Sequence, residues 1–137
     1  MKIILCVDKK NGMMLFGKRQ SQDRVQRERM LSLVGDNRLW ISNYSASLFA
    51  LSDNIEIDDS FPEKATENDY CFFEDKEIDI SKATTVILYK WNRQYPADKF
   101  FSYDLKKNGF SLVSKTDFVG SSHEKITEEI YKRKGIS

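Results

Sequence analysis

Three short, uninterrupted apolar runs constrain the fold of this 137-residue chain more than any other feature. They occupy residues 3–7, 70–73 and 86–89, and β-branched and aromatic side chains dominate them. Runs of this length and composition are typical of strands that are buried on both faces of a sheet. Such a sheet must be covered on each side by other elements, so the runs indicate an α/β domain.

The segments between these runs supply the covering elements. Residues 21–35 predict a helix, because Ser21 can cap its start and Gly35 can end it. Residues 43–50 predict a shorter helix, whereas the acidic stretch 53–69 contains Pro62 and predicts a surface connection. Three further segments predict strands, namely residues 38–42, 54–58 and 110–115. Together they predict one three-layer α/β domain with a central mixed sheet, spanning residues 1–137.

The segment 122–133 has two opposing signals. Ser121 and Glu124 match a capping box, and Gly135 follows a basic run, which favours a helix. The alternation of Ile126, Glu128 and Ile130 with their neighbours instead favours a strand. We expect a strand that pairs with residues 110–118.

The composition excludes several classes of protein. The net charge is +1, which does not favour a partner as negatively charged as a nucleic acid. No apolar run approaches the roughly 20 residues that span a bilayer. The apolar start at residues 3–7 is too short for a signal peptide, so we expect a cytoplasmic protein without a membrane partner.

The supply of metal ligands is small. His123 is the only histidine, and the two cysteines, Cys6 and Cys71, lie apart within apolar runs. A zinc site built on several imidazoles or on a Cys-x-x-Cys pair is therefore excluded, and we expect no metal site. Both cysteines are interpreted as buried thiols that act as small apolar side chains.

Three polar clusters are candidate functional residues, and each also has a purely structural interpretation. Cations around the start of the first helix, including Arg19, could hold an anion or could form a solvated face. His123, with its hydroxyl and carboxylate neighbours, could perform acid–base chemistry or could belong to a turn. A hydrolase would also need an activated nucleophile and a third group that orients the histidine, and residue spacing alone does not show either one. Trp91, Arg93 and Tyr95 could stack on RNA bases or could close a strand end over the core.

The order of three segments resembles the last third of dihydrofolate-reductase-like domains: 82–91, 95–101 and 109–113. The N-terminal third is similar as well, since an apolar strand leads through a long loop to Ser21-Gln22-Asp23 at a helix start. The resemblance implies that Asp23 stands at the family's pterin-orienting Asp and Ser45 at the Thr of a Gly-Arg-x-Thr turn. Tyr89 replaces a small hydroxyl residue at the end of the later strand. It implies a ligand pocket lined by Asp23, Ser45, Tyr89 and Arg19.

One departure from the family bears on the cofactor. The family's Gly-Gly pair, which lets the backbone approach the phosphates of NADPH, is replaced by the segment 70–76, with Glu74 and Asp75. Side chains there prevent a close approach, and two carboxylates repel a pyrophosphate. We therefore expect fold kinship without NADPH binding or reductase activity, and a small nucleotide-like or pterin-like ligand instead.

The chain is also similar to a group of short bacterial proteins that go by the name ribonuclease Z. The matching residues lie at 17–24, 38–40, 91–98 and 122–127. The name implies an RNA-directed protein, with a surface that includes Arg93 and His123. True ribonuclease Z enzymes carry a His-x-His-x-Asp-His motif, and this sequence does not contain it. The sequence therefore predicts a ligand-binding domain, with Asp23 and His123 as candidate catalytic residues. The two alternatives are an RNA-directed protein and an NADPH-dependent reductase.

Overall fold

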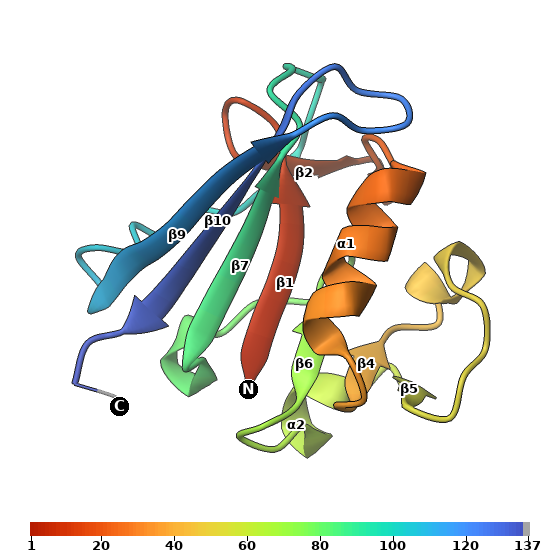
Figure 1. The fold of residues 1–137 in the computed structure, drawn as a ribbon, viewed down its shortest axis with the longest axis vertical. Coiled ribbons are helices and arrows are strands. Elements are labelled where there is room, and N and C mark those ends of the chain that lie inside the picture. Colours follow the sequence, from red (N-terminus) through yellow and green to blue (C-terminus); the bar gives the residue numbers. More distant parts are fainter. Residues whose placement is uncertain (136–137) are drawn as a thin grey trace.

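The computed structural model describes residues 1–135 as strands, helices and connecting turns around one central sheet (Figure 1). Its strands are β1 (Lys2–Val7), β2 (Gly12–Leu15), β3 (Lys18–Arg19), β4 (Leu39–Ile41), β5 (Ile55–Ile57), β6 (Tyr70–Phe72), β7 (Thr85–Lys90), β8 (Lys99–Phe100), β9 (Phe110–Phe118) and β10 (Ile126–Arg133). Its helices are α1 (Arg24–Val34), α2 (Phe61–Lys64) and two single-turn 3₁₀ helices, η1 (Ser45–Leu48) and η2 (Ile80–Lys82).

The three apolar runs form the centre of a seven-stranded sheet, as the sequence predicts. The strand order is β5-β4-β6-β1-β7-β10-β9, and β1 pairs in parallel with both β6 and β7. The register places Ile3 opposite Cys71 on one side and opposite Val86 on the other. β10 runs antiparallel to both β7 and β9, so the sheet is mixed.

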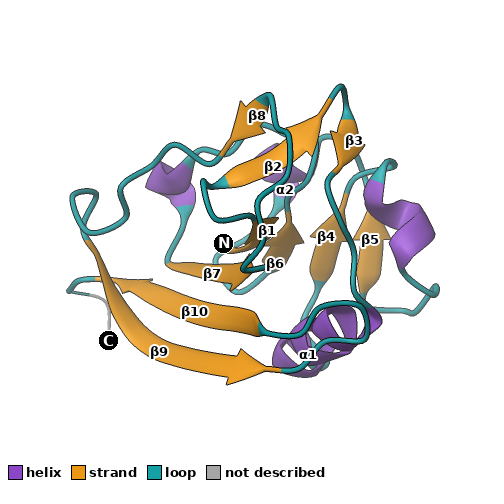
Figure 2. Ribbon diagram, turned by 90° about the horizontal axis from the view of Figure 1, so that it is seen from above, coloured by secondary structure: helices purple, strands orange, loops and turns teal. Residues whose placement is uncertain are grey.

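Two apolar cores lie on opposite faces of this sheet (Figure 2). On one face, Met30 and Val34 of α1 pack on Ile4, Ile87 and neighbouring strand residues. On the other face, the small sheet β3-β2-β8 and the short helices α2 and η2 cover a core that includes Leu5, Val86 and Leu88 (these three are at most 5% exposed). Successive side chains of β1 therefore point into the two cores in turn, which explains why its sequence is continuously apolar.

Several element boundaries differ from the prediction. Asp23, and not Ser21, caps α1, because its carboxylate accepts the backbone N–H of Gln26 at 3.0 Å. Gly35 ends the helix as predicted, with a positive φ of 58° that glycine tolerates. The predicted helix at 43–50 is only the 3₁₀ turn η1.

The prediction of a plain surface connection at 53–69 was partly wrong. This stretch contains the edge strand β5, which matches the strand expected at 54–58, and also the short helix α2. Phe61 of α2 is fully buried and packs edge-on against Phe73, with ring centroids 4.9 Å apart. The strands β2, β3 and β8 were not predicted, because each is only two to four residues long and lacks a clear alternation.

The ambiguous segment near the C-terminus is a strand, β10, as expected. It lies between β7 and β9, and Ile126 and Ile130 face the core under α1 while Tyr131 faces the opposite core. The capping-box residues do not start a helix of their own. Instead, Ser121 and Ser122 donate their backbone N–H groups to Asp23, at 3.1 and 2.8 Å.

Both cysteines are free thiols, Cys71 being buried and Cys6 half-buried. Burial raises the pKa of Cys71 to about 12, in keeping with a thiol that acts as an apolar side chain. Within residues 1–135, no helix has the length and apolar character needed to cross a membrane.

Candidate functional site

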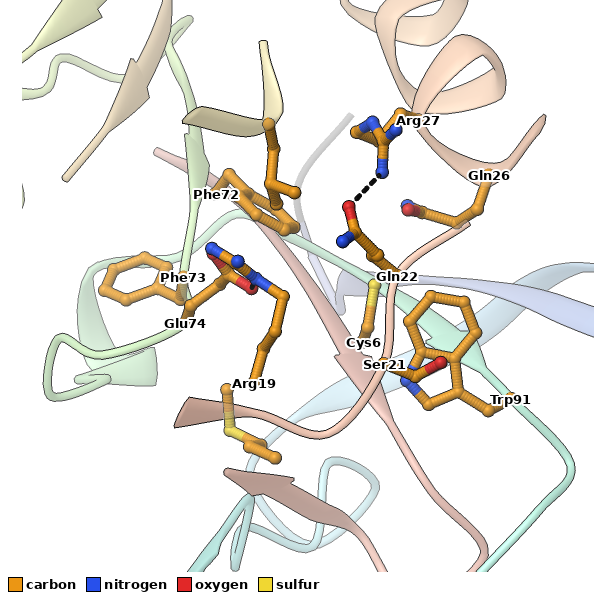
Figure 3. A pocket seen from close by; sticks show the side chains of 12 residues that line it. Cys6, Arg19, Ser21, Gln22, Gln26, Arg27, Phe72, Phe73, Glu74 and Trp91 are labelled. Atoms are coloured by element: carbon orange, nitrogen blue, oxygen red, sulfur yellow. Dashed lines mark hydrogen bonds and ion pairs between the residues drawn. The ribbon is translucent and has the colours of Figure 1, made fainter. Parts of the chain in front are cut away.

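A narrow cavity lies where the parallel strands β1 and β6 end, next to the start of α1 (Figure 3). Ligands of open α/β sheets bind at the carboxyl ends of their strands, so this is the expected place for a site. Apolar walls come from Phe72, Phe73 and Trp91, and polar groups from Ser21, Gln26 and Arg27. The cavity measures about 20 Å³ and has room for about one water molecule.

One side of the cavity is closed by a bidentate ion pair. Arg19 donates from Nε and Nη2 to the carboxylate of Glu74, at 2.8 and 2.9 Å. Ser45 donates its hydroxyl to the same carboxylate at 2.7 Å, and the Arg19 guanidinium lies 4.5 Å from the centre of the Tyr44 ring. The hydrogen bond from Arg19 to Glu74 raises the pKa of Arg19. This fork-to-fork pairing neutralises both charges and holds Arg19 in place.

Asp23 joins the start of α1 to the loop before β10. Its Oδ1 accepts the backbone N–H groups of Gln26 and Ser121, and its Oδ2 accepts the N–H of Ser122 and lies 3.0 Å from Nδ1 of His123. Burial by itself would raise the pKa of Asp23, but these hydrogen bonds outweigh burial and lower it far below its usual range. A side chain on Gly120 would overlap this carboxylate, so the close approach requires glycine there.

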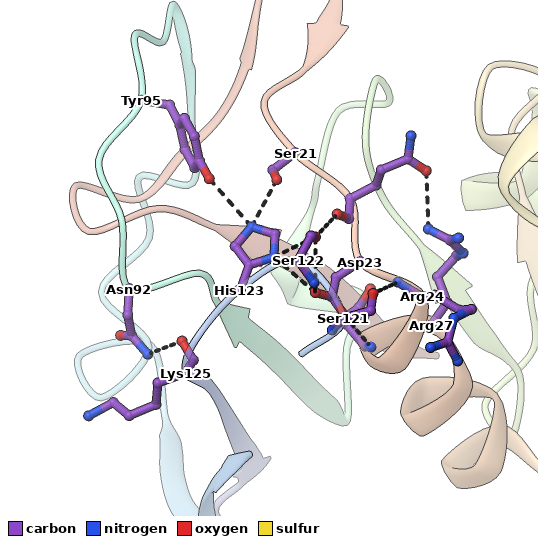
Figure 4. A network of polar contacts seen from close by, with 12 residues as sticks. Ser21, Asp23, Arg24, Arg27, Asn92, Tyr95, Ser121, Ser122, His123 and Lys125 are labelled. Atoms are coloured by element: carbon purple, nitrogen blue, oxygen red, sulfur yellow. Dashed lines mark hydrogen bonds and ion pairs between the residues drawn. The ribbon is translucent and has the colours of Figure 1, made fainter. Parts of the chain in front are cut away.

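His123 lies at the centre of a buried polar network (Figure 4). Its ring stacks on Trp91, with centroids 4.4 Å apart and planes inclined by 19°. Its Nε2 lies 2.9 Å from Oγ of Ser21 and 3.4 Å from the hydroxyl of Tyr95. Because the ionised carboxylate of Asp23 can only accept, the neutral His123 ring carries its hydrogen on Nδ1, and its Nε2 can then accept the Ser21 hydroxyl hydrogen.

Gln26 is the residue of this site that the sequence analysis missed. It lies on the face of α1 that also carries Met30 and Val34, and it is 2% exposed. Its amide nitrogen Nε2 has no hydrogen-bond partner among residues 1–135, and the side chain points toward the cavity (Figure 3). A buried donor without a partner costs about 1–3 kcal/mol, which an acceptor brought by a ligand would offset. The available signal was that Gln26 lies four and eight residues before the apolar Met30 and Val34, and so on the same face of the helix.

The structure separates the residues that the resemblance groups into one pocket. Of Asp23, Ser45, Tyr89 and Arg19, only Arg19 lines the cavity. Asp23 and Ser45 are buried and bonded to His123 and Glu74. Tyr89 is also buried, and it donates to Glu128 beneath α1 at 2.9 Å. Tyr89 and Asp23 therefore support the framework around the cavity instead of facing a ligand in it.

The residues considered for RNA binding are also dispersed. Arg93 is exposed beside Lys9 and Lys125, in a shallow hollow outside the cavity. Trp91 and His123 are each 3% exposed and stack on one another, so neither ring is open to a nucleic-acid base. Within the described part of the chain, no group of three or more His, Cys, Asp or Glu side chains is placed to hold a metal ion.

The segment after β6 does not fit a nicotinamide dinucleotide. Glu74 accepts from Arg19 and Ser45, and Asp75 accepts the hydroxyl of Ser42 at 2.7 Å. Both carboxylates occupy the place where the resemblance expects a Gly-Gly pair beside a pyrophosphate. Their side chains fill the space that a Gly-Gly pair would leave open for a pyrophosphate.

Comparison with known proteins identifies the fold and nothing finer. No protein-family model matches the sequence, and no curated protein matches it either. Among solved structures, the chain is similar to dihydrofolate reductase from Enterococcus faecalis complexed with NADP(H) and RAB-propyl, with a TM-score of 0.69. The match covers 97% of this chain and 95% of that one at 11% sequence identity. The chain therefore has the dihydrofolate reductase fold, with a mixed central sheet in a single α/β domain.

Proposed function

We propose that this chain binds a small planar molecule carrying a negative charge, in the cavity between α1, β1 and β6, and that it has no reductase activity. The observation that carries the proposal is the buried Nε2 of Gln26, which lacks a partner and points toward a cavity lined by aromatic rings. A heteroaromatic ligand with a ring carbonyl or ring nitrogen would accept from this amide. Nucleotides and pterins have this chemistry.

The charge of the ligand follows from the outer end of the cavity. Arg27 is half-buried there, and its guanidinium donates to the neutral amide of Gln22 at 3.1 Å. An anionic group of the ligand would replace that neutral partner with a stronger, charge-assisted one. Gln22 is exposed, and both side chains are long and flexible, so we expect them to turn outward when a ligand enters the narrow cavity.

A thermal-shift screen tests this proposal. Nucleoside monophosphates, pterin-6-carboxylate and folate are added in turn, because a ligand that binds only the folded chain raises its melting temperature. We expect at least one to do so, and we expect Gln26→Leu to weaken its binding about tenfold, the loss of roughly one hydrogen bond. Gln94→Leu makes the same change at an exposed position outside the cavity and is the matched control.

The outcomes separate clearly. No shift with any of these compounds, or equal affinity in Gln26→Leu and Gln94→Leu, would contradict the proposed site. NADPH is screened in parallel, and we expect neither a thermal shift nor quenching of the tryptophan fluorescence. Saturable quenching by NADPH, together with its oxidation in the presence of dihydrofolate, would overturn the statement that this chain is not a reductase.

A further inference from the structure

We propose that Ser21, His123 and Asp23 form a nucleophilic centre that hydrolyses a small carboxylic ester. The three side chains are connected in line, with Ser21 Oγ 2.9 Å from His123 Nε2 and His123 Nδ1 3.0 Å from Asp23 Oδ2. Ser21 lines the cavity and is half-buried, whereas His123 and Asp23 are almost completely buried behind it. Nucleophile, base and orienting group therefore stand in the order that an activated serine requires.

Each partner is held in the state that its role needs. The carboxylate of Asp23 stays ionised, because hydrogen bonds from His123 and from three backbone N–H groups stabilise its charge. It keeps the hydrogen of His123 on Nδ1, so that Nε2 can accept the Ser21 proton. Stacking on Trp91 and burial of the ring hold His123 in one orientation, with Nε2 facing Ser21. Asp23 is thus a positioning residue, and Ser21 and His123 are the catalytic residues.

A donor for the developing oxyanion is available in the same cavity. Gln26 Nε2 is buried and has no partner among residues 1–135, and both Gln26 and Ser21 line the cavity (Figure 3). An amide N–H that is already desolvated and unpaired can stabilise the negative oxygen of a tetrahedral intermediate without first breaking another bond. Ser21 and Gln26 at the cavity, with His123 and Asp23 buried behind Ser21, therefore supply the four groups of a serine hydrolase site.

The reaction balances with water as the only co-reactant. Ser21 Oγ attacks the ester carbonyl carbon while its proton passes to His123 Nε2. The tetrahedral intermediate collapses, the bond to the alcohol oxygen breaks, and His123 returns the proton to the departing alcohol. Water then attacks the acyl group on Ser21 with His123 again as base, and the carboxylic acid and free Ser21 are released.

The centre shares its cavity with the proposed ligand site, and the ester enters through the same outward turn of Arg27 and Gln22, because the closed cavity has room for only about one water molecule. The reaction does not depend on the ligand being planar. The test uses generic reagents: a fluorophosphonate, which phosphonylates activated serines, and p-nitrophenyl acetate as ester. In the intact chain we expect one fluorophosphonate adduct, located on Ser21 by mass spectrometry of its peptides. We expect the rate of p-nitrophenyl acetate hydrolysis to fall at least 100-fold in Ser21→Ala and to stay unchanged in Ser102→Ala, an exposed serine outside the cavity.

Two further variants separate catalysis from a structural role. His123→Phe keeps an aromatic ring against Trp91, and we expect it to lose labelling of Ser21. Since His123 is the only histidine, ¹⁵N NMR of its ring reports the tautomer without ambiguity. We expect the proton on Nδ1 in the natural chain. In Asp23→Asn the side-chain amide can donate to Nδ1, so we expect the proton on Nε2 and slower labelling of Ser21.

An unlabelled Ser21 in the folded natural chain, or equal hydrolysis by the natural chain and Ser21→Ala, would overturn the proposal. A proton on Nε2 in the natural chain would do so as well. These results are independent of the thermal-shift screen. An adduct on Ser21 without any thermal shift would support a hydrolase for a non-planar ester and contradict the proposed planar ligand. A thermal shift without an adduct would support the binding site and overturn the hydrolase. If His123→Phe does not fold, the adduct and the Ser21→Ala rate still decide the question.

Discussion

Two residues at the start of α1 show how neighbouring polar groups take opposite roles. Asp23 caps the helix and also accepts hydrogen bonds from the loop before β10, so both oxygens of its carboxylate are already bonded to protein groups. Gln26, one turn later, is just as buried, yet its Nε2 has no partner among residues 1–135. Asp23 therefore stabilises the framework of the site, whereas Gln26 can donate a hydrogen bond to a ligand or to a reacting oxygen.

The ionisation of Asp23 predicts a specific dependence of stability on pH. Its pKa is lower in the folded chain than the unfolded value near 3.9, so its contribution to stability is complete above that pH and is lost as the pH falls. We expect Asp23→Asn to unfold more easily than the natural chain at pH 7. This difference should shrink below pH 4, by up to about 1.4 kcal/mol per pH unit. Urea unfolding followed by tryptophan fluorescence at pH 7, 4 and 3 measures it.

The control for this experiment is Asp53→Asn, which removes an exposed carboxylate far along the chain from the network. If the curves of the natural chain and Asp23→Asn ran parallel from pH 4 to pH 3, the network around His123 would not be what keeps Asp23 ionised.

At the scale of elements, α1 is attached to the sheet by apolar packing and by one buried polar cluster. Arg29 of α1 donates to the carboxylate of Glu128 on β10, from Nε at 2.8 Å and from Nη2 at 3.1 Å. Tyr89 of β7 donates to the same carboxylate at 2.9 Å. Glu128 therefore links the helix to two neighbouring strands of the sheet.

Removing the charge of Glu128 should loosen this attachment. We expect Glu128→Gln to lower the free energy of unfolding by about 2–3 kcal/mol, because Arg29 loses its counter-charge and the neutral amide accepts less well from Tyr89. Arg29 is partly exposed and can regain water, which limits the loss. Hydrogen exchange measured by NMR should also speed up at the amides of α1.

The matched control for this prediction is Glu28→Gln. Glu28 pairs with Arg24 on the exposed face of the same helix, and we expect a change of no more than about 0.5 kcal/mol. Equal losses in the two variants would mean that the buried cluster does not attach α1 to the sheet.

For the whole molecule, the central sheet separates two apolar cores, and each contains one tryptophan. Trp91 lies in the core under α1, and Trp40 lies in the core on the opposite face. Strands β1, β6 and β7 contribute alternate side chains to both cores, so neither core can lose its packing without disturbing the strands that support the other.

This arrangement predicts a single cooperative unfolding transition. In Trp91→Phe the fluorescence reports only on the core around Trp40, and in Trp40→Phe it reports only on the core around Trp91. For each variant, we expect the fluorescence transition in urea to coincide with the transition seen by far-ultraviolet circular dichroism, with the same midpoint and slope. A fluorescence transition that preceded the loss of circular dichroism in either variant would show that the two cores unfold separately.

Short-range patterns determined much of the architecture. The apolar runs at 3–7, 70–73 and 86–89 predict buried strands, because such runs cannot be exposed on either face, and they are the centre of the sheet. Gly35 predicts the end of α1 for an equally local reason, the positive φ that it adopts. These features depend on residues within one turn or one strand of each other.

Only the tertiary structure decided the site, because its contacts join residues that are far apart in the chain. Ser121 and Ser122 form a capping pattern by local rules, but they serve the start of α1 about 100 residues earlier through Asp23. His123 meets Ser21 across a similar separation, and the missing partner of Gln26 depends on everything packed around it. No periodicity records which of many polar groups will meet at that distance. The sequence by itself therefore determined the strands and the class of fold, and packing decided which side chains face the cavity.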